Sequence, residues 1–381
     1  MNVLYVGGFK LPDKNAAAHR VLANAKILRD LGSKVYLLGQ TDDIHLASNH
    51  LIKEECKEKD IFMFSQAYPK GILEWFNYII DVGTIKKCIK MYNVDCIILY
   101  NYPSFATYRL LPFLKKNNIK VYADCTEWYG KSTGNIIKRL IKDFDTVFRM
   151  KWINFKLDGV ICISSYLQKY YKSSRTLLLP PLVDLEEKKW MDITNVNINS
   201  LEPITFIYAG QIGGHKDQLD EIIDILIDLK LKFNLNFNLK LVGITKEDYL
   251  KNICNRKIDP SLIFYGRLSH TDTLKEVKSS DFVLFFREIN RVNMAGFPTK
   301  FVEAVTCGVP VITNKTSDLN DYLINDYNGY FLEGSNENIF NILKNILELD
   351  RLKISELKSN TKQNNPFKYR LYYKQFKEFL H

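Results

Sequence analysis

The chain has 381 residues, of which 46 % are hydrophobic and 25 % are charged. This balance is typical of folded globular proteins and excludes disordered, collagenous and low-complexity chains, and the length predicts about two domains. No apolar run approaches the ~18–20 residues that cross a bilayer, and no basic region precedes the strand-like start. We therefore expect neither a membrane span nor a secretory signal.

The 53 basic and 43 acidic residues give a net charge of +10. This excess favours anionic partners such as nucleotides, phosphorylated lipids, anionic membrane surfaces or nucleic acid. The seven cysteines are odd in number and form no C-x-x-C pair, which predicts a reduced cytoplasmic chain without a metal site.

The first half of the chain alternates short apolar strands with helical patterns. A strand at 3–6 is followed by Gly7 and Gly8, by apolar positions at helical spacing between 21 and 31, and by a strand at 35–38. Further strands are predicted at 96–100, 121–123, 160–163 and 177–179. Such alternation predicts a parallel sheet buried on both faces.

A polar stretch at 184–202 predicts a linker to a second α/β series. The strands of this series are predicted at 204–209, 239–242, 262–265, 282–286 and 309–313. Residues 351–381 are predicted to form one or two helices, the last of which crosses back onto the first domain. The predicted domains are 1–183 with about 364–381, and 203–363.

The densest signal for chemistry lies at 296–312, GFPTKFVEAVTCGVPVI. Pro298 or Thr299 starts a short helix that ends at Gly308 and leads into a buried strand. A helix start after a glycine loop, at the carboxyl edge of a parallel sheet, favours phosphate binding because free amides point at the anion. Lys300 adds a positive charge, and Glu303 can accept two hydrogen bonds from a ribose.

A second signal is the strand that runs into the glycine-rich segment 208–216, YAGQIGGHK. Gly210, Gly213 and Gly214 allow close approach to a phosphate, and Lys216 can reach over the loop toward a diphosphate. The alternative is an ordinary turn followed by a surface lysine. His215 and His270 are expected to have no role in binding.

The two signals together resemble the retaining, nucleotide-sugar-dependent glycosyltransferases of the GT-B fold, in the group 1 or family 4 variant with P-x-K-x-x-E. The resemblance implies an α/β protein with two Rossmann-like domains facing across a cleft, the second of which binds the donor sugar nucleotide. It implies no cofactor beyond that donor substrate. Lys216 and Lys300 are expected to neutralise the diphosphate leaving group, and the departing phosphate is expected to assist acceptor deprotonation.

The first half of the chain carries two segments that resemble the acceptor-binding loops of this family. Residues 15–20, NAAAHR, followed by a helix, are similar to the family's acceptor loop, and 124–129, DCTEWY, are similar to its second active-site loop. The resemblance implies acceptor contacts by His19, Asp124 and Glu127, with catalytic roles for the two carboxylates. The alternatives are a structural histidine and a helix cap at Asp124 or Thr126.

Two positions depart from the family pattern. Ala295 stands where members often carry a first glutamate, and Gln211 stands where they often carry an arginine. Lys300 is expected to supply the charge of that arginine. Glu288 or Asn293 is the predicted substitute for the missing glutamate.

The segment 131–156 has apolar residues at helical spacing and seven positive charges. It is either a membrane-surface element or an ordinary helix with its apolar face in the core. Asp143 and Asp145 spell the D-x-D of metal-dependent transferases of another fold, but a solvated helix face is the favoured interpretation.

The predicted function is therefore metal-independent transfer of a sugar from a nucleotide-diphosphate sugar to a glycan or lipid-linked acceptor, in bacterial surface polysaccharide synthesis. The expected location is the cytoplasm, with possible peripheral association with an anionic membrane. The alternatives are a GT-B-fold sugar-nucleotide epimerase and a nucleic-acid-binding protein, although the motifs of nucleic-acid recognition are missing.

Overall fold

The computed structural model describes residues 1–12, 14–42, 51–56, 58–69, 71–128, 136–191, 202–210, 219–252, 258–363 and 365–380. The chain divides into two compact units. Unit 1 comprises Met1–Asp184, Met294–Phe297 and Lys368–His381, and unit 2 comprises Leu185–Asn293 and Pro298–Phe367. Among the described residues, no helix has both the length and the apolar character needed to cross a membrane.

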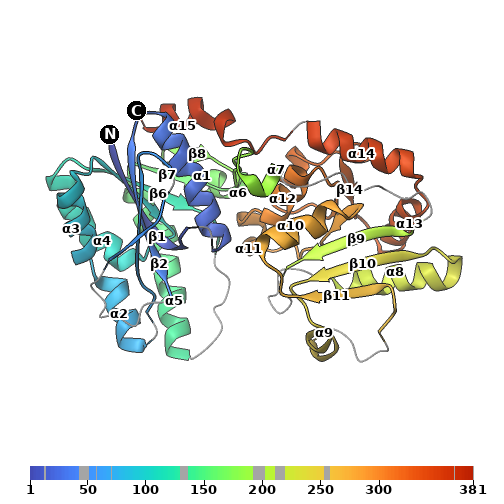
Figure 1. The fold of residues 1–381 in the computed structure, drawn as a ribbon. Coiled ribbons are helices and arrows are strands. Elements are labelled where there is room, and N and C mark those ends of the chain that lie inside the picture. Colours follow the sequence, from blue (N-terminus) through green and yellow to red (C-terminus); the bar gives the residue numbers. More distant parts are fainter. Residues whose placement is uncertain are drawn as a thin grey trace. The chain divides into compact units, whose positions relative to one another are not determined.

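Unit 1 is built on an eight-stranded sheet with the strand order β3-β4-β2-β1-β5-β6-β7-β8 (Figure 1). All neighbouring strands are parallel except β3 and β4. The strands are β1 (Asn2–Lys10), β2 (Lys34–Thr41), β3 (Ile52–Glu54), β4 (Ile61–Ala67), β5 (Cys96–Tyr100), β6 (Lys120–Cys125), β7 (Gly159–Cys162) and β8 (Thr176–Leu178). The strands predicted for the first half are confirmed, but the prediction missed β3 and β4.

Helices connect these strands. They are α1 (Ala16–Asp30), α2 (Ile72–Ile80), α3 (Gly83–Tyr92), α4 (Ser104–Lys116), α5 (Ile136–Phe148), the π-helix η1 (Arg149–Ile153), the 3-10 helix η2 (Asn154–Lys156) and α6 (Ser165–Tyr170). Helix α1 begins earlier than predicted, because the Asn15 side chain accepts a hydrogen bond from the Ala18 amide and caps it. Residues 16–20 are therefore the first turn of a helix rather than a loop.

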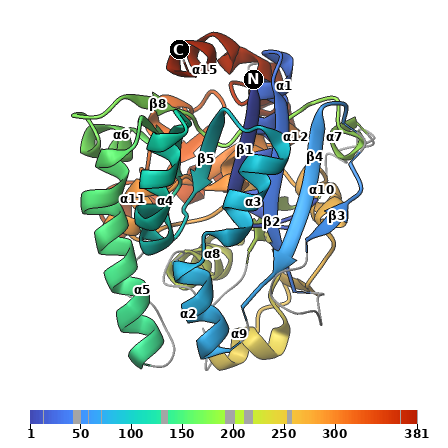
Figure 2. The ribbon, with the colours of Figure 1, turned by 90° about the vertical axis from the view of Figure 1, so that its left-hand side faces the viewer.

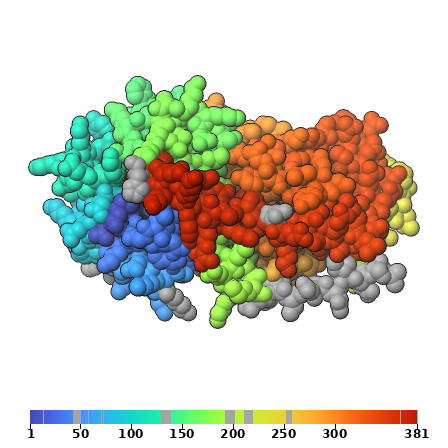
Figure 3. Space-filling model, turned by 90° about the horizontal axis from the view of Figure 1, so that it is seen from above, coloured from blue at the N-terminus to red at the C-terminus, as the bar shows by residue number. Residues whose placement is uncertain are grey.

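The C-terminal segment completes the core of unit 1, as predicted. The 3-10 helix η4 (Tyr369–Tyr372) and the helix α15 (Tyr373–Leu380) place Phe376 and Phe379 in the same buried cluster as strand β1. The Phe379 ring lies 4.9 Å from that of Tyr122, and Arg175 Nη2 donates to the Glu378 carbonyl (2.6 Å). Figure 3 shows the C-terminal segment (red) against the N-terminal part of unit 1 (blue).

Unit 2 is built on a six-stranded parallel sheet with the order β11-β10-β9-β12-β13-β14. Its strands are β9 (Ile204–Ala209), β10 (Phe237–Val242), β11 (Leu262–Gly266), β12 (Phe282–Leu284), β13 (Val311–Thr313) and β14 (Gly329–Phe331). The five predicted strands are confirmed, and β14 was missed. Its helices are α7 (Lys188–Met191), α8 (Asp220–Phe233), α9 (Lys246–Asn252), α10 (His270–Lys278), α12 (Thr299–Cys307), the 3-10 helix η3 (Leu319–Asp321), α13 (Asn336–Leu347) and α14 (Arg351–Gln363). Helix α11 (Arg291–Ala295) begins in unit 2 and ends in the segment Met294–Phe297, which belongs to unit 1.

The acidic pair of the D-x-D sequence lies on α5, and the expectation of a solvated face is wrong for Asp145. This carboxylate is buried and accepts hydrogen bonds from both the amide and the hydroxyl of Ser104 (2.7 Å each). Ser104 is the first residue of α4, and Pro103 before it provides no side-chain cap. Asp145 therefore supplies from a neighbouring helix the acceptor that α4 lacks at its own start.

An Asp145→Ala variant is expected to lose about 0.5–2 kcal/mol of stability, the usual cost of removing a helix-capping acceptor. The free energy of unfolding in urea measures this loss. Ser104→Ala removes only the hydroxyl bond and leaves the amide bond, so its loss should be smaller. Equal stabilities of wild type and Asp145→Ala would contradict the capping role.

Candidate functional site

The strand order of unit 2 reverses direction at β9, which lies between β10 and β12. In open parallel sheets, ligands bind outside the carboxyl ends of the strands at such a switch point. Tyr208 is the penultimate residue of β9, and Phe285 directly follows β12. The rings of both residues are therefore placed at this edge of the sheet.

Lys300 lies at the same switch point. Its Nζ is 4.3 Å from the centre of the Tyr208 ring and 5.4 Å from that of Phe285. Two aromatic rings at these distances stabilise an ammonium group, and Lys300 is partly exposed. The predicted helix that carries Lys300 is confirmed: α12 begins at Thr299 after Pro298, and Gly308 ends it in a left-handed conformation.

The strand ends beside Lys300 approach each other too closely for side chains. A Cβ at Gly210 would lie 2.8 Å from the Tyr208 hydroxyl and 3.1 Å from Lys300 Nζ. A Cβ at Gly243, which has φ +90°, would lie 2.3 Å from the Gly210 carbonyl oxygen. Glycine at these positions exposes the backbone at the mouth of the sheet, where a phosphate needs close access.

Glu303 lies one turn further along α12 and pairs with His270. The distance from Glu303 Oε1 to His270 Nε2 is 3.1 Å, and both side chains are partly exposed. His270 is the first residue of α10, and the Trp190 ring packs edge-on against it. The sequence analysis gave His270 no role, because its 33-residue separation from Glu303 hides the pairing.

Most of the glycine-rich segment 208–216, the second predicted part of the diphosphate site, cannot be placed. Gln211, Gly213, Gly214, His215 and Lys216 lie outside the described residues. Whether Lys216 shares a site with Lys300 stays a prediction. The contribution of Thr299 and Pro298 through the start of α12 also stays a prediction.

The loop after β12 contains a polar network that the sequence analysis missed. Arg287 is buried, and its Nη2 donates to the Asn293 side-chain oxygen (2.8 Å). Asn293 donates in turn to the Glu288 carbonyl (2.8 Å), and Asn314 accepts from the Arg287 amide (2.9 Å). Asn293 is thus fully buried, whereas the Glu288 side chain is exposed. The network fixes the segment that leads to the buried Ala295.

Of the acceptor-side candidates, Asp124 lies in β6 and is fully buried. It does not cap a helix, so the capping alternative is wrong for Asp124. Arg20 Nη2 donates to its carboxylate at 2.8 Å, and the Tyr5 hydroxyl donates at 2.5 Å. Burial and the nearby Asp124 charge raise the pKa of Tyr5 well above its usual value, so Tyr5 remains protonated and donates.

Arg20 links this carboxylate to the rest of unit 1. Its Nη1 also donates to the Leu179 carbonyl (2.8 Å), and Tyr5 accepts from Asn24 (3.1 Å). The network therefore ties α1, β1 and β6 to the chain after β8. It favours a positioning role for Asp124, and direct acceptor contact by Asp124 stays a prediction.

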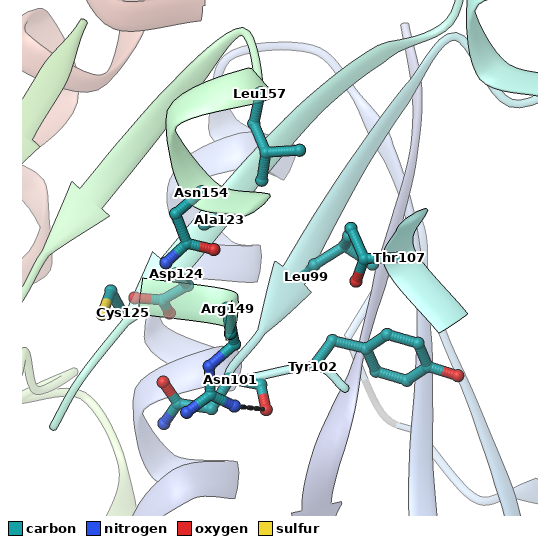
Figure 4. Close-up of a pocket in the computed structure, with 10 residues that line it drawn as sticks. All are labelled: Leu99, Asn101, Tyr102, Thr107, Ala123, Asp124, Cys125, Arg149, Asn154 and Leu157. Atoms are coloured by element: carbon teal, nitrogen blue, oxygen red, sulfur yellow. Dashed lines mark hydrogen bonds between the residues drawn. The ribbon is translucent and has the colours of Figure 1, made fainter. Parts of the chain in front are cut away.

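A small cavity lies beside Asp124 at the carboxyl ends of β5 and β6 (Figure 4). Its polar lining includes Asn101, Asn154 and Arg149, whose Nη1 donates to the Asn101 carbonyl (2.6 Å). Arg149 is buried, although the sequence analysis counted it among the charges of the basic segment. Glu127 and His19 are partly exposed, and their acceptor contacts stay predictions.

Comparisons with known proteins agree with this architecture. Residues 192–366 match the family Glycosyl transferases group 1. The chain is similar in structure to sucrose-phosphate synthase from Thermosynechococcus elongatus (TM-score 0.72, 14 % identity, covering 100 % of this chain and 98 % of that one). A comparison with curated protein sequences found no match.

Two further solved structures are similar over nearly their full lengths. One is a glycosyltransferase from Rickettsia africae (TM-score 0.67, 16 % identity, 100 % and 98 % coverage). The other is HepE from Anabaena in complex with UDP and glucose (TM-score 0.63, 16 % identity, 100 % and 99 % coverage).

The fold and the family match together define the class of protein. The chain has the GT-B fold, with two Rossmann-like α/β domains, and its second half matches the group 1 glycosyltransferases. Residues 192–366, which include the Lys300 helix, form a group 1 glycosyltransferase domain. The resemblance to group 1 glycosyltransferases of the GT-B fold, predicted from the P-x-K-x-x-E segment, is confirmed, and the retaining subtype stays a prediction.

Proposed function

We propose that the protein transfers a sugar from a nucleotide-diphosphate sugar to a glycan or lipid-linked acceptor, with retention of the anomeric configuration and without a metal ion. The observation that carries the proposal is the position of Lys300 at the switch point of unit 2, beside the side-chain-free strand ends at Gly210 and Gly243. A cation and the start of a helix at this edge suit a diphosphate. We further propose a role in bacterial surface polysaccharide synthesis, at the cytoplasmic face of the membrane.

The proposed reaction requires positive charge beside the leaving group. When the anomeric bond breaks, negative charge develops on the diphosphate, and groups already oriented toward it lower the barrier. Lys300 and the first amides of α12 would supply this stabilisation, with Lys216 as the predicted second cation. The departing phosphate would accept the acceptor proton, and Glu127 and His19 would orient the acceptor.

The proposal is tested first by ligand stabilisation. UDP, GDP, ADP and CMP are added separately, and a nucleotide that binds only the folded protein raises its melting temperature. The sugar nucleotides of the stabilising base are then assayed with and without acceptor. Transfer only with acceptor, undiminished by a chelator and with the donor's anomeric configuration by NMR, supports the proposal. Conversion of the donor alone would instead indicate an epimerase, and salt-sensitive oligonucleotide binding without nucleotide affinity would indicate a nucleic-acid binder.

A Glu303→Ala variant is expected to bind the nucleoside diphosphate about 10–100-fold more weakly, because a carboxylate accepting hydroxyl hydrogen bonds contributes about 1.5–3 kcal/mol. Calorimetry measures the change. Glu333→Ala is the matched control, since Glu333 is also paired with a basic side chain, Lys315, but on the exposed surface. Unchanged affinity in Glu303→Ala would assign Glu303 to a structural role with His270.

A further inference from the structure

Helices α4 and α5 of unit 1 expose an apolar surface that the proposed reaction does not use. Leu140 is 61 % exposed, Phe144 58 % and Val147 49 %, and their spacing places them on one face of α5. Trp152 on η1 is 61 % exposed, and Phe105 and Tyr108 on α4 are also exposed. We name these six residues the α4–α5 apolar surface. Figure 2 shows the two helices side by side.

The surface is ordered by contacts between its rings. The Phe105 ring stacks on that of Phe144 with their centres 5.9 Å apart, and it lies 5.7 Å from that of Phe148. The Tyr108 ring lies 6.4 Å from the Phe148 ring. An ordered aromatic cluster that remains exposed to water marks an interaction surface rather than a core. The alternative that the apolar face of this segment lies in the core is therefore wrong for these residues.

The elements that carry this surface also expose basic side chains. The exposed ones on α4, α5 and η1 are Arg109, Lys115, Lys116, Arg139, Lys142 and Lys151. The acidic groups on these same elements are Asp143 and Asp145, and Asp145 is buried against Ser104. Lys142 Nζ also lies 4.9 Å from the Trp75 ring of α2, which joins the charge to a further aromatic group.

We propose that the α4–α5 apolar surface docks unit 1 on an anionic lipid bilayer. Exposed tryptophan, phenylalanine and leucine with lysines around them are the pattern that inserts at the boundary between headgroups and acyl chains. The lysines add attraction to anionic headgroups. A second copy of the chain fits less well, because face-to-face pairing would bring two sets of like charges together. The inference concerns binding alone and does not depend on the sugar-transfer reaction.

Flotation of the purified protein with vesicles tests the proposal. Binding is expected to vesicles of phosphatidylglycerol mixed with phosphatidylcholine, to weaken with added salt, and to be slight with phosphatidylcholine alone. Brominated lipids are expected to quench tryptophan fluorescence, and this quenching should fall in Trp152→Phe. No binding, or equal binding to both vesicle types, would overturn the proposal.

Two pairs of substitutions separate the apolar and charged contributions. Leu140→Ser with Phe144→Ser is expected to lower the partition coefficient at least tenfold, since each removes exposed apolar area that the bilayer would cover. Lys142→Gln with Lys151→Gln is expected to lower it about fivefold for each charge removed. All four side chains are exposed, so these variants are expected to have the melting temperature of the wild type.

Matched pairs in unit 2 serve as controls. Leu231→Ser with Leu352→Ser removes apolar side chains that are at least as exposed as Leu140 and Phe144, and Lys232→Gln with Lys275→Gln removes two exposed lysines. Neither pair should change the partition coefficient. Equal losses in the control and test pairs would contradict docking through this surface. A concentration-dependent dimer that the Leu140→Ser and Phe144→Ser pair dissociates would show self-association instead.

Discussion

A Lys300→Ala variant is expected to lose about 10²–10³-fold in turnover, the usual effect of removing one preorganised group that stabilises transition-state charge. The ammonium lies 4.3 Å from the centre of the Tyr208 ring and 5.4 Å from that of the Phe285 ring, at the switch point of unit 2. Steady-state kinetics with the donor identified by ligand stabilisation measures the effect. The loss should appear in kcat as well as in kcat/KM, because the charge being stabilised develops as the bond breaks.

The matched control is Lys344→Ala. Lys344 Nζ lies 4.4 Å from the Phe233 ring, nearly the distance of Lys300 from Tyr208. Phe233 ends α8 and precedes β10, so this second lysine–ring pair lies at the amino edge of the sheet. Its loss should leave turnover unchanged. Near-wild-type turnover in Lys300→Ala would overturn the proposal that the diphosphate binds at this switch point.

An Asp124→Ala variant is expected to lose about 3–5 kcal/mol of stability, because it leaves the Arg20 guanidinium buried without its counter-charge. The pair is almost completely excluded from solvent, with side-chain exposures of 3 % and 0 %. The attraction of Asp124 raises the pKa of Arg20 although burial alone would lower it, so the arginine stays charged in the folded state. Thermal and urea unfolding of unit 1 measures the loss.

A control variant and a conservative variant complete this test. The first controls for the loss of an ion pair, and the second distinguishes positioning from direct acceptor contact. Asp228→Ala breaks the exposed pair with Lys232 and should cost less than about 1 kcal/mol. Asp124→Asn keeps the shape of the side chain while removing its charge. If Asp124 only positions α1 and β6, donor hydrolysis and transfer should decline in proportion to the folded fraction. A selective loss of transfer at full folding would support acceptor contact by Asp124.

The sequence predicted those features that depend on neighbouring residues. The α12 helix follows from Pro298 at its start and Gly308 at its end, and the parallel sheets follow from short apolar strands between helical patterns. The strand β4 was missed because its residues alternate between buried and half-buried, which is a weaker signal than a continuous apolar run.

The pairs that build the candidate site depend on residues far apart in the chain. Arg20 meets Asp124 across 104 positions, and His270 meets Glu303 across 33. Only the order and register of the strands bring such residues together, so composition and periodicity cannot predict them. The burial of Arg149 has the same origin, since a basic segment at helical spacing does not reveal which of its charges faces the sheet.

The placement of Phe376 and Phe379 within the N-terminal unit has a consequence for synthesis of the protein. These residues emerge from the ribosome only after every residue of unit 2, which ends at Phe367. The apolar residues that Phe376 and Phe379 cover in unit 1 therefore stay uncovered while unit 2 is being translated. The two units therefore cannot complete their folding in the order in which they are synthesised. Unit 1 begins first and is completed last.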